Sequence, residues 1–210
     1  MTRILVADDH AIVRTGLKIF IEKLVPDSSI EEAQDGPDAY KKIEEEDFDL
    51  IILDANMPET DPLQLVSNIV TLKPEAKILM FTMNAEEVYA KKFLQAGAKG
   101  YLNKGSSEVE IQSAIEHVLN NKRYVSPTLS QQLAIEAITG KGDNPFDNLS
   151  PREFEIVLHL LKGESISNIC SKLNLHTSTI GTYKSRIFDK LNCTNIIDIN
   201  LLAKVHKVIA

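Results

Sequence analysis

The first 121 residues alternate five short strand-like runs with longer stretches in which apolar residues recur at helical spacing. The runs, in chain order, are RILVA, SIEEA, DLIILD, KILMFT and GYL, of which SIEEA is only a weak strand. The third and fourth runs are apolar almost without interruption, as in strands that are covered on both faces. Such strands need helices above and below them, and alternating strand–helix units pair in parallel. The pattern therefore predicts a doubly wound α/β domain around a five-stranded parallel sheet.

The remainder of the chain shows only helical patterns. Residues 122–148 are predicted to be a linker that contains a helix, because Ser126 and Pro127 suit a cap and a first turn whereas GKGDNPFDN is rich in turn formers. Beyond it, Ser150 and Glu153 form a capping box at the start of one helix, and three more helices follow. The predicted organisation is an α/β domain over residues 1–121, a linker over 122–148 and an all-α four-helix domain over 149–210.

Charge differs between the two predicted domains. The chain has a net charge of −7 over its 210 residues, which on its own argues against binding to nucleic acid. Residues 1–121, however, hold 12 Lys and Arg against 22 Asp and Glu, whereas residues 149–210 hold 8 against 5. The net charges are thus −10 and +3. An acidic first domain and a mildly basic last domain predict two separate tasks.

The composition predicts a cytoplasmic protein. No apolar run approaches the roughly 20 residues that a membrane-spanning helix needs, and acidic residues follow the amino terminus too closely for a signal peptide. The two cysteines, Cys170 and Cys193, lack the spacing of metal ligands. We therefore expect both thiols to be reduced and structural.

Charged and hydroxyl side chains stand where the predicted strands end. Asp8 and Asp9 follow the first strand and Asp54 the third, while Thr82 ends the fourth and Lys104 comes just after the fifth. The carboxyl ends of parallel strands meet at one edge of a sheet, so these side chains should share a pocket. Three carboxylates together demand a cation, and an oxygen-only ligand set suits Mg²⁺. The sequence therefore predicts a magnesium site.

The segments LVADDH, LIILDANMP, MFT and GYLNK resemble the receiver domain of two-component response regulators, over essentially all of residues 1–121. This resemblance implies a flavodoxin-like fold and makes Asp54 the acceptor of a phosphoryl group. Asp9 would bind Mg²⁺ directly, Asp8 directly or through water, and Asn56 through its backbone carbonyl. The implied chemistry is phosphoryl transfer by positioning and charge neutralisation.

The same resemblance gives roles to three further residues. Thr82 would hydrogen-bond the phosphoryl group, Lys104 would pair with it, and Tyr101 would swing inward as Thr82 moves. His10, next to the acidic pair, is predicted to be a solvent-side residue without chemistry.

Residues 149–210 resemble the LuxR-type (NarL/FixJ) helix-turn-helix domain. The spacing of a short helix, a four-residue turn and a third helix supports this, and the exposed side of the third helix would enter a major groove. Arg186 suits a guanine edge or a phosphate, whereas Lys184, Lys190 and Thr179 are better placed as phosphate anchors. His176 replaces the usual serine cap of this helix, which leaves the capping to Thr177 or Ser178. The residues expected to contact DNA are Thr179, Thr182, Tyr183, Lys184, Ser185, Arg186 and Lys190.

Together, the two resemblances imply a transcriptional regulator rather than an enzyme, controlled by phosphorylation of Asp54. Its partners would be a sensor histidine kinase, double-stranded DNA, RNA polymerase and a second copy of the chain. An apolar stripe in the last helix could form the dimer or pack within its own domain; it consists of Ile197, Leu201, Leu202 and Val205.

Two alternatives remain at this stage. One is a constitutive DNA-binding regulator whose receiver domain does not switch. The other is a phosphohydrolase of the haloacid dehalogenase type, which would need a second Asp two residues after the nucleophile, where this chain has Asn56.

Overall fold

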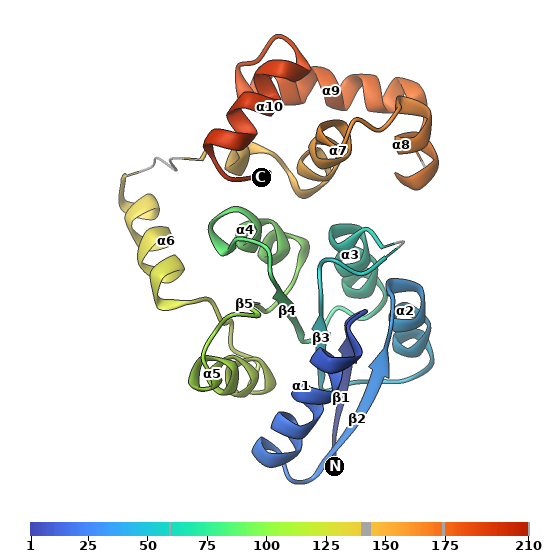
Figure 1. The fold of residues 1–210 in the computed structure, drawn as a ribbon, viewed down its shortest axis with the longest axis vertical. Helices are drawn as coiled ribbons and strands as arrows, with labels where there is room; N and C mark the ends of the chain where they lie inside the picture. Colours follow the sequence, from blue (N-terminus) through green and yellow to red (C-terminus); the bar gives the residue numbers. More distant parts are fainter. Residues whose placement is uncertain (59, 140–143, 174, 210) are drawn as a thin grey trace. The chain divides into compact units, whose positions relative to one another are not determined.

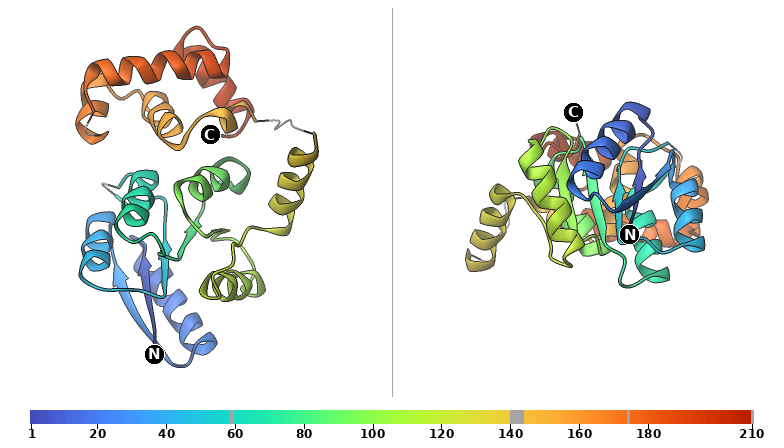
Figure 2. Two further views of the ribbon diagram at one scale, coloured as in Figure 1. Left: turned by 180° about the vertical axis from the view of Figure 1, so that it is seen from behind. Right: turned by 90° about the horizontal axis from the view of Figure 1, so that it is seen from below.

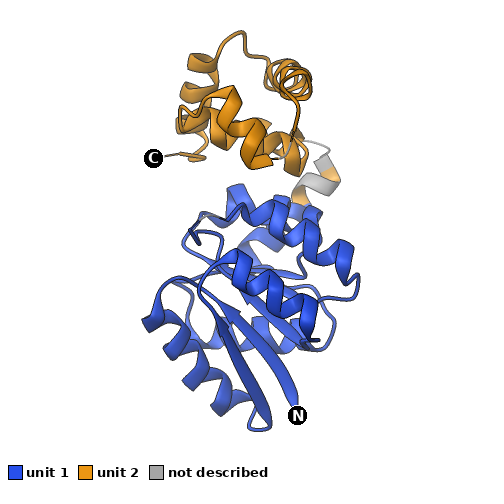
Figure 3. Ribbon diagram, turned by 90° about the vertical axis from the view of Figure 1, so that its right-hand side faces the viewer, with its two compact units in different colours: residues 1–134 blue, residues 135–210 orange. Residues whose placement is uncertain are grey.

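The computed structural model describes residues 1–58, 60–139, 144–173 and 175–209. These residues form two compact units, an N-terminal unit of Met1–Ala134 and a C-terminal unit of Ile135–Ala210 (Figure 3). The division lies inside the segment predicted to be a linker, whose residues 140–143 are outside the described residues.

The N-terminal unit is a five-stranded parallel sheet in the order β2-β1-β3-β4-β5, with helices on both faces (Figures 1 and 2). This confirms the predicted doubly wound fold. The strands are β1 (Thr2–Ala7), β2 (Ser28–Ala33), β3 (Leu50–Leu53), β4 (Ile78–Thr82) and β5 (Gly100–Asn103). The helices are α1 (Ala11–Leu24), α2 (Gly36–Glu45), α3 (Pro62–Leu72), α4 (Glu86–Ala96) and α5 (Glu108–Leu119).

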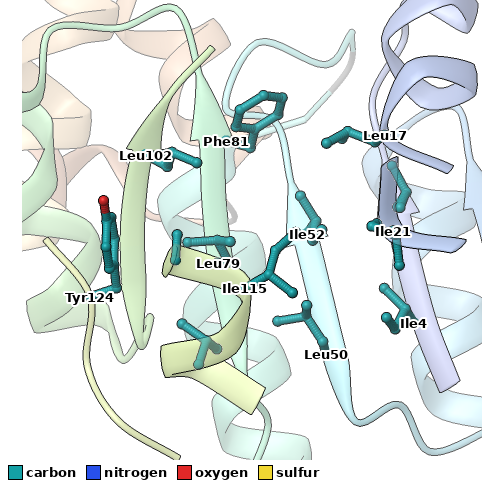
Figure 4. Packing of buried hydrophobic residues seen from close by; sticks show 13 residues of the cluster. Ile4, Leu17, Ile21, Leu50, Ile52, Leu79, Phe81, Leu102, Ile115 and Tyr124 are labelled. Atoms are coloured by element: carbon teal, nitrogen blue, oxygen red, sulfur yellow. The ribbon is translucent and has the colours of Figure 1, made fainter. Parts of the chain in front are cut away.

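One face of the sheet packs against α1 and α5 (Figure 4). Leu17 and Ile21 of α1 and Ile115 of α5 lie among apolar side chains of the four strands β1, β3, β4 and β5. Burial of each such side chain stabilises the fold by about 1.5–3 kcal/mol. The strand residues in this cluster are Ile4, Val6, Leu50, Ile52, Leu79, Phe81 and Leu102. Because neighbouring residues of a strand face opposite sides, the helices fix the register of the strands and hence the positions of their ends.

Polar caps define where several helices begin. The Asp61 side chain accepts a hydrogen bond from the Gln64 backbone N–H at 3.0 Å, and Pro62 is the first residue of α3. Ser107 and Glu110 form a capping box at α5. These caps satisfy backbone donors that a helix end leaves unpaired, so they place the loops that follow β3 and β5.

The segment after α5 belongs to both units. Tyr124 is buried against the N-terminal sheet, where its backbone N–H donates to the Lys99 carbonyl at 2.9 Å. Helix α6 (Pro127–Thr139) then begins with Ser126 as its cap, as predicted, since Ser126 Oγ accepts from the Leu129 backbone N–H at 3.1 Å. A 3₁₀ turn, η1 (Pro145–Asn148), precedes the remaining helices of the C-terminal unit, and its Phe146 is buried.

After η1, the described residues of the C-terminal unit form four α-helices and no strand, which confirms the predicted all-α domain. They are α7 (Pro151–Leu161), α8 (Ile166–Leu173), α9 (Thr177–Leu191) and α10 (Ile196–Val205). The predicted capping box of Ser150 and Glu153 is present at α7. The prediction for the cap of α9 was wrong: the cap residue is His176, whose side chain makes no cap hydrogen bond, and Thr177 and Ser178 already lie within the helix.

Candidate functional site

The predicted carboxylates meet at the carboxyl edge of the sheet. Strands β1 and β3 are neighbours in register from Ile4 with Leu50 to Ala7 with Leu53 (Figure 1), so Asp8 and Asp54 emerge side by side. The side chains of Asp8 and Asp54 are 2% and 1% exposed, whereas that of Asp9 is 32% exposed. Two carboxylates are therefore desolvated together, and they need a positive charge to compensate them.

Lys104 supplies part of that charge. Its Nζ lies 2.6 Å from Asp8 Oδ2 and 2.8 Å from Asp54 Oδ2, and its backbone N–H donates to the Thr82 carbonyl at 2.9 Å. Burial alone would lower the pKa of Lys104, but the hydrogen bonds to Asp54 and Asp8 outweigh burial and raise it above the ordinary lysine value. Lys104 is thus a fixed cation between two buried acids.

The acidic pocket has the oxygen donors that a divalent cation requires. Asp54 Oδ1 is buried and has no hydrogen-bond partner among the described residues. One ligand atom from each of Asp8, Asp9, His10 and Asp54 lies within 4.8 Å of the others. Carboxylate oxygens at such separations suit Mg²⁺, which takes one or two carboxylates and keeps several waters. The residues present therefore fit a hard divalent cation.

Thr82 and Tyr101 are linked through the loop after β4. Thr82 Oγ1 accepts hydrogen bonds from Asn56 Nδ2 at 3.2 Å and from the Asn84 backbone N–H at 3.4 Å. The Tyr101 hydroxyl donates to the Asn84 carbonyl at 2.9 Å. Tyr101 is fully buried, and burial raises the pKa of its hydroxyl, so it stays a neutral donor. Asn84, which connects the two side chains, was not among the predicted site residues, and no pattern in the sequence marks it.

Arg14 is another residue that sequence reasoning missed. Its guanidinium donates to the Asp8 carbonyl at 2.7 Å and to Glu32 Oε2 at 2.9 Å, and the residue is buried. Arg14 therefore connects the loop after β1 to strand β2 through these two hydrogen bonds. A signal was available, because Arg14 precedes Leu17 and Ile21 by three and seven residues and thus interrupts the apolar stripe of α1 with a charge.

Four of the predicted DNA-contacting residues, Thr179, Thr182, Tyr183 and Arg186, lie on one open side of α9. Thr182, Ser185 and Arg186 are exposed, whereas Ile180 and Ile187 are buried on the opposite side. A shallow surface hollow of about 280 Å³ follows the exposed side. It is lined by Ser178, Thr179, Thr182, Tyr183 and Arg186. Ser178 is an addition to the predicted set, and its sequence signal was its position one turn before Thr182.

The two lysines that were predicted to anchor phosphates have different surroundings. Lys190 Nζ lies 2.7 Å from Glu153 Oε2, so it connects α9 to the start of α7. Lys184 Nζ lies 5.5 Å from the centre of the Phe188 ring, within reach of a cation–π interaction. Among the described residues Lys184 forms no ion pair with a carboxylate, whereas Lys190 is paired with Glu153.

Glu153→Gln is expected to lower the free energy of local unfolding of α7 and α9 by about 0.5–1 kcal/mol at pH 7. Glutamine keeps the capping box but loses the charge that pairs with Lys190. Burial alone would raise the pKa of Glu153, but the bonds from Lys190 and Ser150 outweigh burial and lower it. The stabilisation is therefore present above the ordinary glutamate pKa and is lost as the pH falls through the lowered one. Amide hydrogen exchange on the full chain at pH 7 and pH 3 measures both effects.

Asp189→Asn is the matched control for that variant, because it removes the same charge from an exposed position of α9. Equal protection of α7 and α9 in the wild type and in Glu153→Gln at pH 7 would mean that the ion pair adds nothing to the packing of the two helices.

Comparisons with known proteins agree with this geometry. The family model "Response regulator receiver domain" matches residues 4–116, and the model "Bacterial regulatory proteins, luxR family" matches residues 147–203. The chain is a two-component response regulator. The order of the two domains places it in the NarL/FixJ family, which the sequence had indicated.

Similar response regulators match along the whole chain. "Response regulator UvrY" of Escherichia coli (strain K12) is 35% identical over 98% of this chain and 95% of its own length. "Response regulator GacA" of Pseudomonas aeruginosa is 34% identical over 100% of this chain and 98% of its own. A solved structure of RcsB from Salmonella enterica serovar Typhimurium, bound to promoter P1flhDC in the presence of phosphomimetic BeF3-, is also similar. Its TM-score to this chain is 0.74 at 25% sequence identity, and the alignment covers 97% of this chain and 98% of the RcsB chain.

None of the helices in the described part of this response regulator combines the length and the apolar character needed to span a bilayer.

Proposed function

We propose that Asp54 accepts a phosphoryl group from a sensor histidine kinase and that this modification controls the binding of DNA by the C-terminal unit. The observation that carries the proposal is the environment of Asp54. Lys104 binds one carboxylate oxygen, while the other is buried and has no hydrogen-bond partner in the part of the chain that the structure describes. A carboxylate so placed is desolvated and oriented for attack. The match to the receiver family over residues 4–116 supports the same role.

The chemistry needs little from the protein except position and charge. Asp54 Oδ1 would attack the phosphorus of a phosphohistidine, so that a P–O bond forms as the P–N bond breaks and the electron pair leaves with the imidazole nitrogen. Lys104 would neutralise an oxygen of the transferred group, and the Thr82 hydroxyl would donate a hydrogen bond to another. Bound Mg²⁺ would supply further charge neutralisation, with Asp8, Asp9, Asp54 and the Asn56 carbonyl as its protein ligands.

The loop after β4 provides a path from this site to the surface. If Thr82 turns toward the phosphoryl group, it leaves the hydrogen bonds from Asn56 and Asn84. The Asn84 carbonyl accepts the hydrogen bond from Tyr101, whose side chain is already buried. Movement of this loop would therefore also move Tyr101 and change the surface beside α4 and β5. The proposed switch is thus a rearrangement of Thr82, Asn84 and Tyr101.

The DNA-bound structures of RcsB support DNA as the partner of the C-terminal unit. A net charge of +3 on residues 149–210 gives weak binding for one copy, so we propose a dimer that doubles the contacts. Ile197, Leu201 and Val205 of α10 are 69%, 61% and 74% exposed, and they would form the contact between the copies. A regulator of this kind would act on RNA polymerase at promoters in the cytoplasm.

The test compares the wild type with Asp54→Asn in DNA binding, using a site selected by the phosphorylated protein. Acetyl phosphate and Mg²⁺ should label the wild type and strengthen its binding by tenfold or more, about 1.4 kcal/mol. Neither effect should occur in Asp54→Asn, whereas Asp27→Asn, an exposed acid at the opposite edge of the sheet, should behave as the wild type. Equal strengthening of wild type and Asp54→Asn would show that phosphorylation of Asp54 is not the switch.

A further inference from the structure

His10 is exposed to solvent, as the sequence predicted, but its ring also lies at the acidic pocket. Its Nδ1 is 2.7 Å from Asp9 Oδ1 and 3.2 Å from Asp8 Oδ1. Its backbone N–H donates to Asp8 Oδ1 at 2.8 Å, which fixes the start of α1 against the first carboxylate. The ring is 65% exposed, so its apolar surface is not what holds it in this place.

The positions of these atoms match the spacing of ligands around one ion. Two ligands that bind a divalent cation at about 2.1 Å and at right angles are about 3 Å apart. Nδ1 of His10 has this separation from a carboxylate oxygen of each neighbouring aspartate. The buried Asp54 Oδ1, without a hydrogen-bond partner among the described residues, provides an independent sign that the pocket takes a ligand.

We propose that His10 Nδ1 is a nitrogen ligand of the cation site, which makes the pocket a mixed nitrogen and oxygen site that favours first-row transition cations such as Co²⁺ and Mn²⁺ over Mg²⁺. This inference rests on the proposed function, in which Asp8, Asp9 and Asp54 hold the cation. Without a cation, Nδ1 is at hydrogen-bond distance from a carboxylate oxygen of each aspartate. In the proposed complex the cation would replace the hydrogen on Nδ1, and the tautomer with hydrogen on Nε2 would present its Nδ1 lone pair to the metal.

The ligand chemistry accounts for the expected selectivity. Imidazole nitrogen is a good ligand for Co²⁺ and other later first-row cations, whereas Mg²⁺ prefers oxygen. The affinity of a given nitrogen and oxygen site rises from Mn²⁺ to Co²⁺. Loss of the imidazole should therefore weaken the binding of Co²⁺ strongly, that of Mn²⁺ less, and that of Mg²⁺ hardly at all.

The experiment titrates the full chain with Co²⁺, Mn²⁺ and Mg²⁺ and compares the wild type with His10→Gln. We expect His10→Gln to weaken Co²⁺ binding about tenfold or more and Mg²⁺ binding by less than about threefold. Pulsed electron paramagnetic resonance of bound Mn²⁺ should show coupling to a ¹⁴N nucleus in the wild type and not in His10→Gln. His117→Gln is the matched control, because it removes an exposed histidine from α5 of the same unit and should keep the coupling.

The outcomes separate the inference from the function on which it rests. Unchanged Co²⁺ affinity in His10→Gln, or a wild type without nitrogen coupling, overturns the role of His10 even if Mg²⁺ still supports phosphorylation of wild-type Asp54. The proposed metal site itself fails if Asp9→Asn and Asp54→Asn both bind Mg²⁺ as tightly as the wild type.

Discussion

Lys104→Met is expected to lower the free energy of unfolding of the N-terminal unit by about 3 kcal/mol at pH 7 in the absence of divalent cations. The side chains of Asp8 and Asp54 are almost fully buried, and Lys104 is the cation that lies within 2.8 Å of both. Methionine retains much of the volume but leaves two desolvated carboxylates facing one another. Removal of one member of a buried ionic cluster has this size of effect because the remaining charges stay buried without compensation.

Urea unfolding of the full chain, followed by circular dichroism, measures the change, and two further conditions separate charge from packing. Mg²⁺ should recover part of the lost stability, because it binds the folded site and not the unfolded chain. The double variant Lys104→Met/Asp54→Asn should be less destabilised than Lys104→Met, because it carries one buried charge fewer. Lys99→Met is the control for loss of a lysine near β5 outside the pocket. A Lys104→Met protein as stable as the wild type would mean that water already compensates the two acids.

The pH dependence of this effect follows from the raised pKa of Lys104. A lysine whose pKa is higher in the folded state contributes stability that is complete below the ordinary lysine pKa of about 10.4 and disappears as the pH rises through the raised value. The difference in unfolding free energy between wild type and Lys104→Met should therefore remain level from pH 7 to pH 9. It should shrink at higher pH.

The sheet and the pocket were predictable because they depend on the order of residues along strands. The apolar run DLIILD indicated a strand covered on both faces, and a parallel sheet brings the residues after its strands to one edge. Asp8, Asp54 and Lys104 were therefore found by position alone. Their contacts needed no knowledge of side-chain conformation.

Contacts between helices were not predictable in the same way. Lys190 was expected to bind a DNA phosphate. The direction of its side chain, however, depends on how α9 packs against the start of α7, where Lys190 forms an ion pair with Glu153. His10 is a similar case, since its ring could have turned to either side of the loop after β1. Such outcomes depend on rotamers and on packing between elements that are distant in sequence, which a linear pattern does not record.

Arg186→Ala is expected to weaken binding to the selected DNA site by about 10–100-fold, or about 1–3 kcal/mol. Arg186 is exposed and lines the hollow on α9 together with Tyr183 and the short hydroxyl residues Ser178, Thr179 and Thr182. A long guanidinium flanked by short hydroxyl residues can reach a base edge in the major groove, where two parallel hydrogen bonds to guanine discriminate between base pairs. Binding competition with singly substituted sites should therefore show relaxed preference at one base pair in each half-site.

Lys184→Ala gives the contrasting result that makes the assignment specific. A phosphate contact carries no sequence information, so this variant should weaken binding to every DNA sequence alike and reduce the dependence on salt concentration by about one unit in slope. Lys162→Ala removes an equal charge at the end of α7 and serves as the control. If Arg186→Ala instead weakens all sequences equally, Arg186 is a phosphate ligand. Recognition of bases by α9 would then depend on its hydroxyl side chains, Ser178, Thr182 and Ser185.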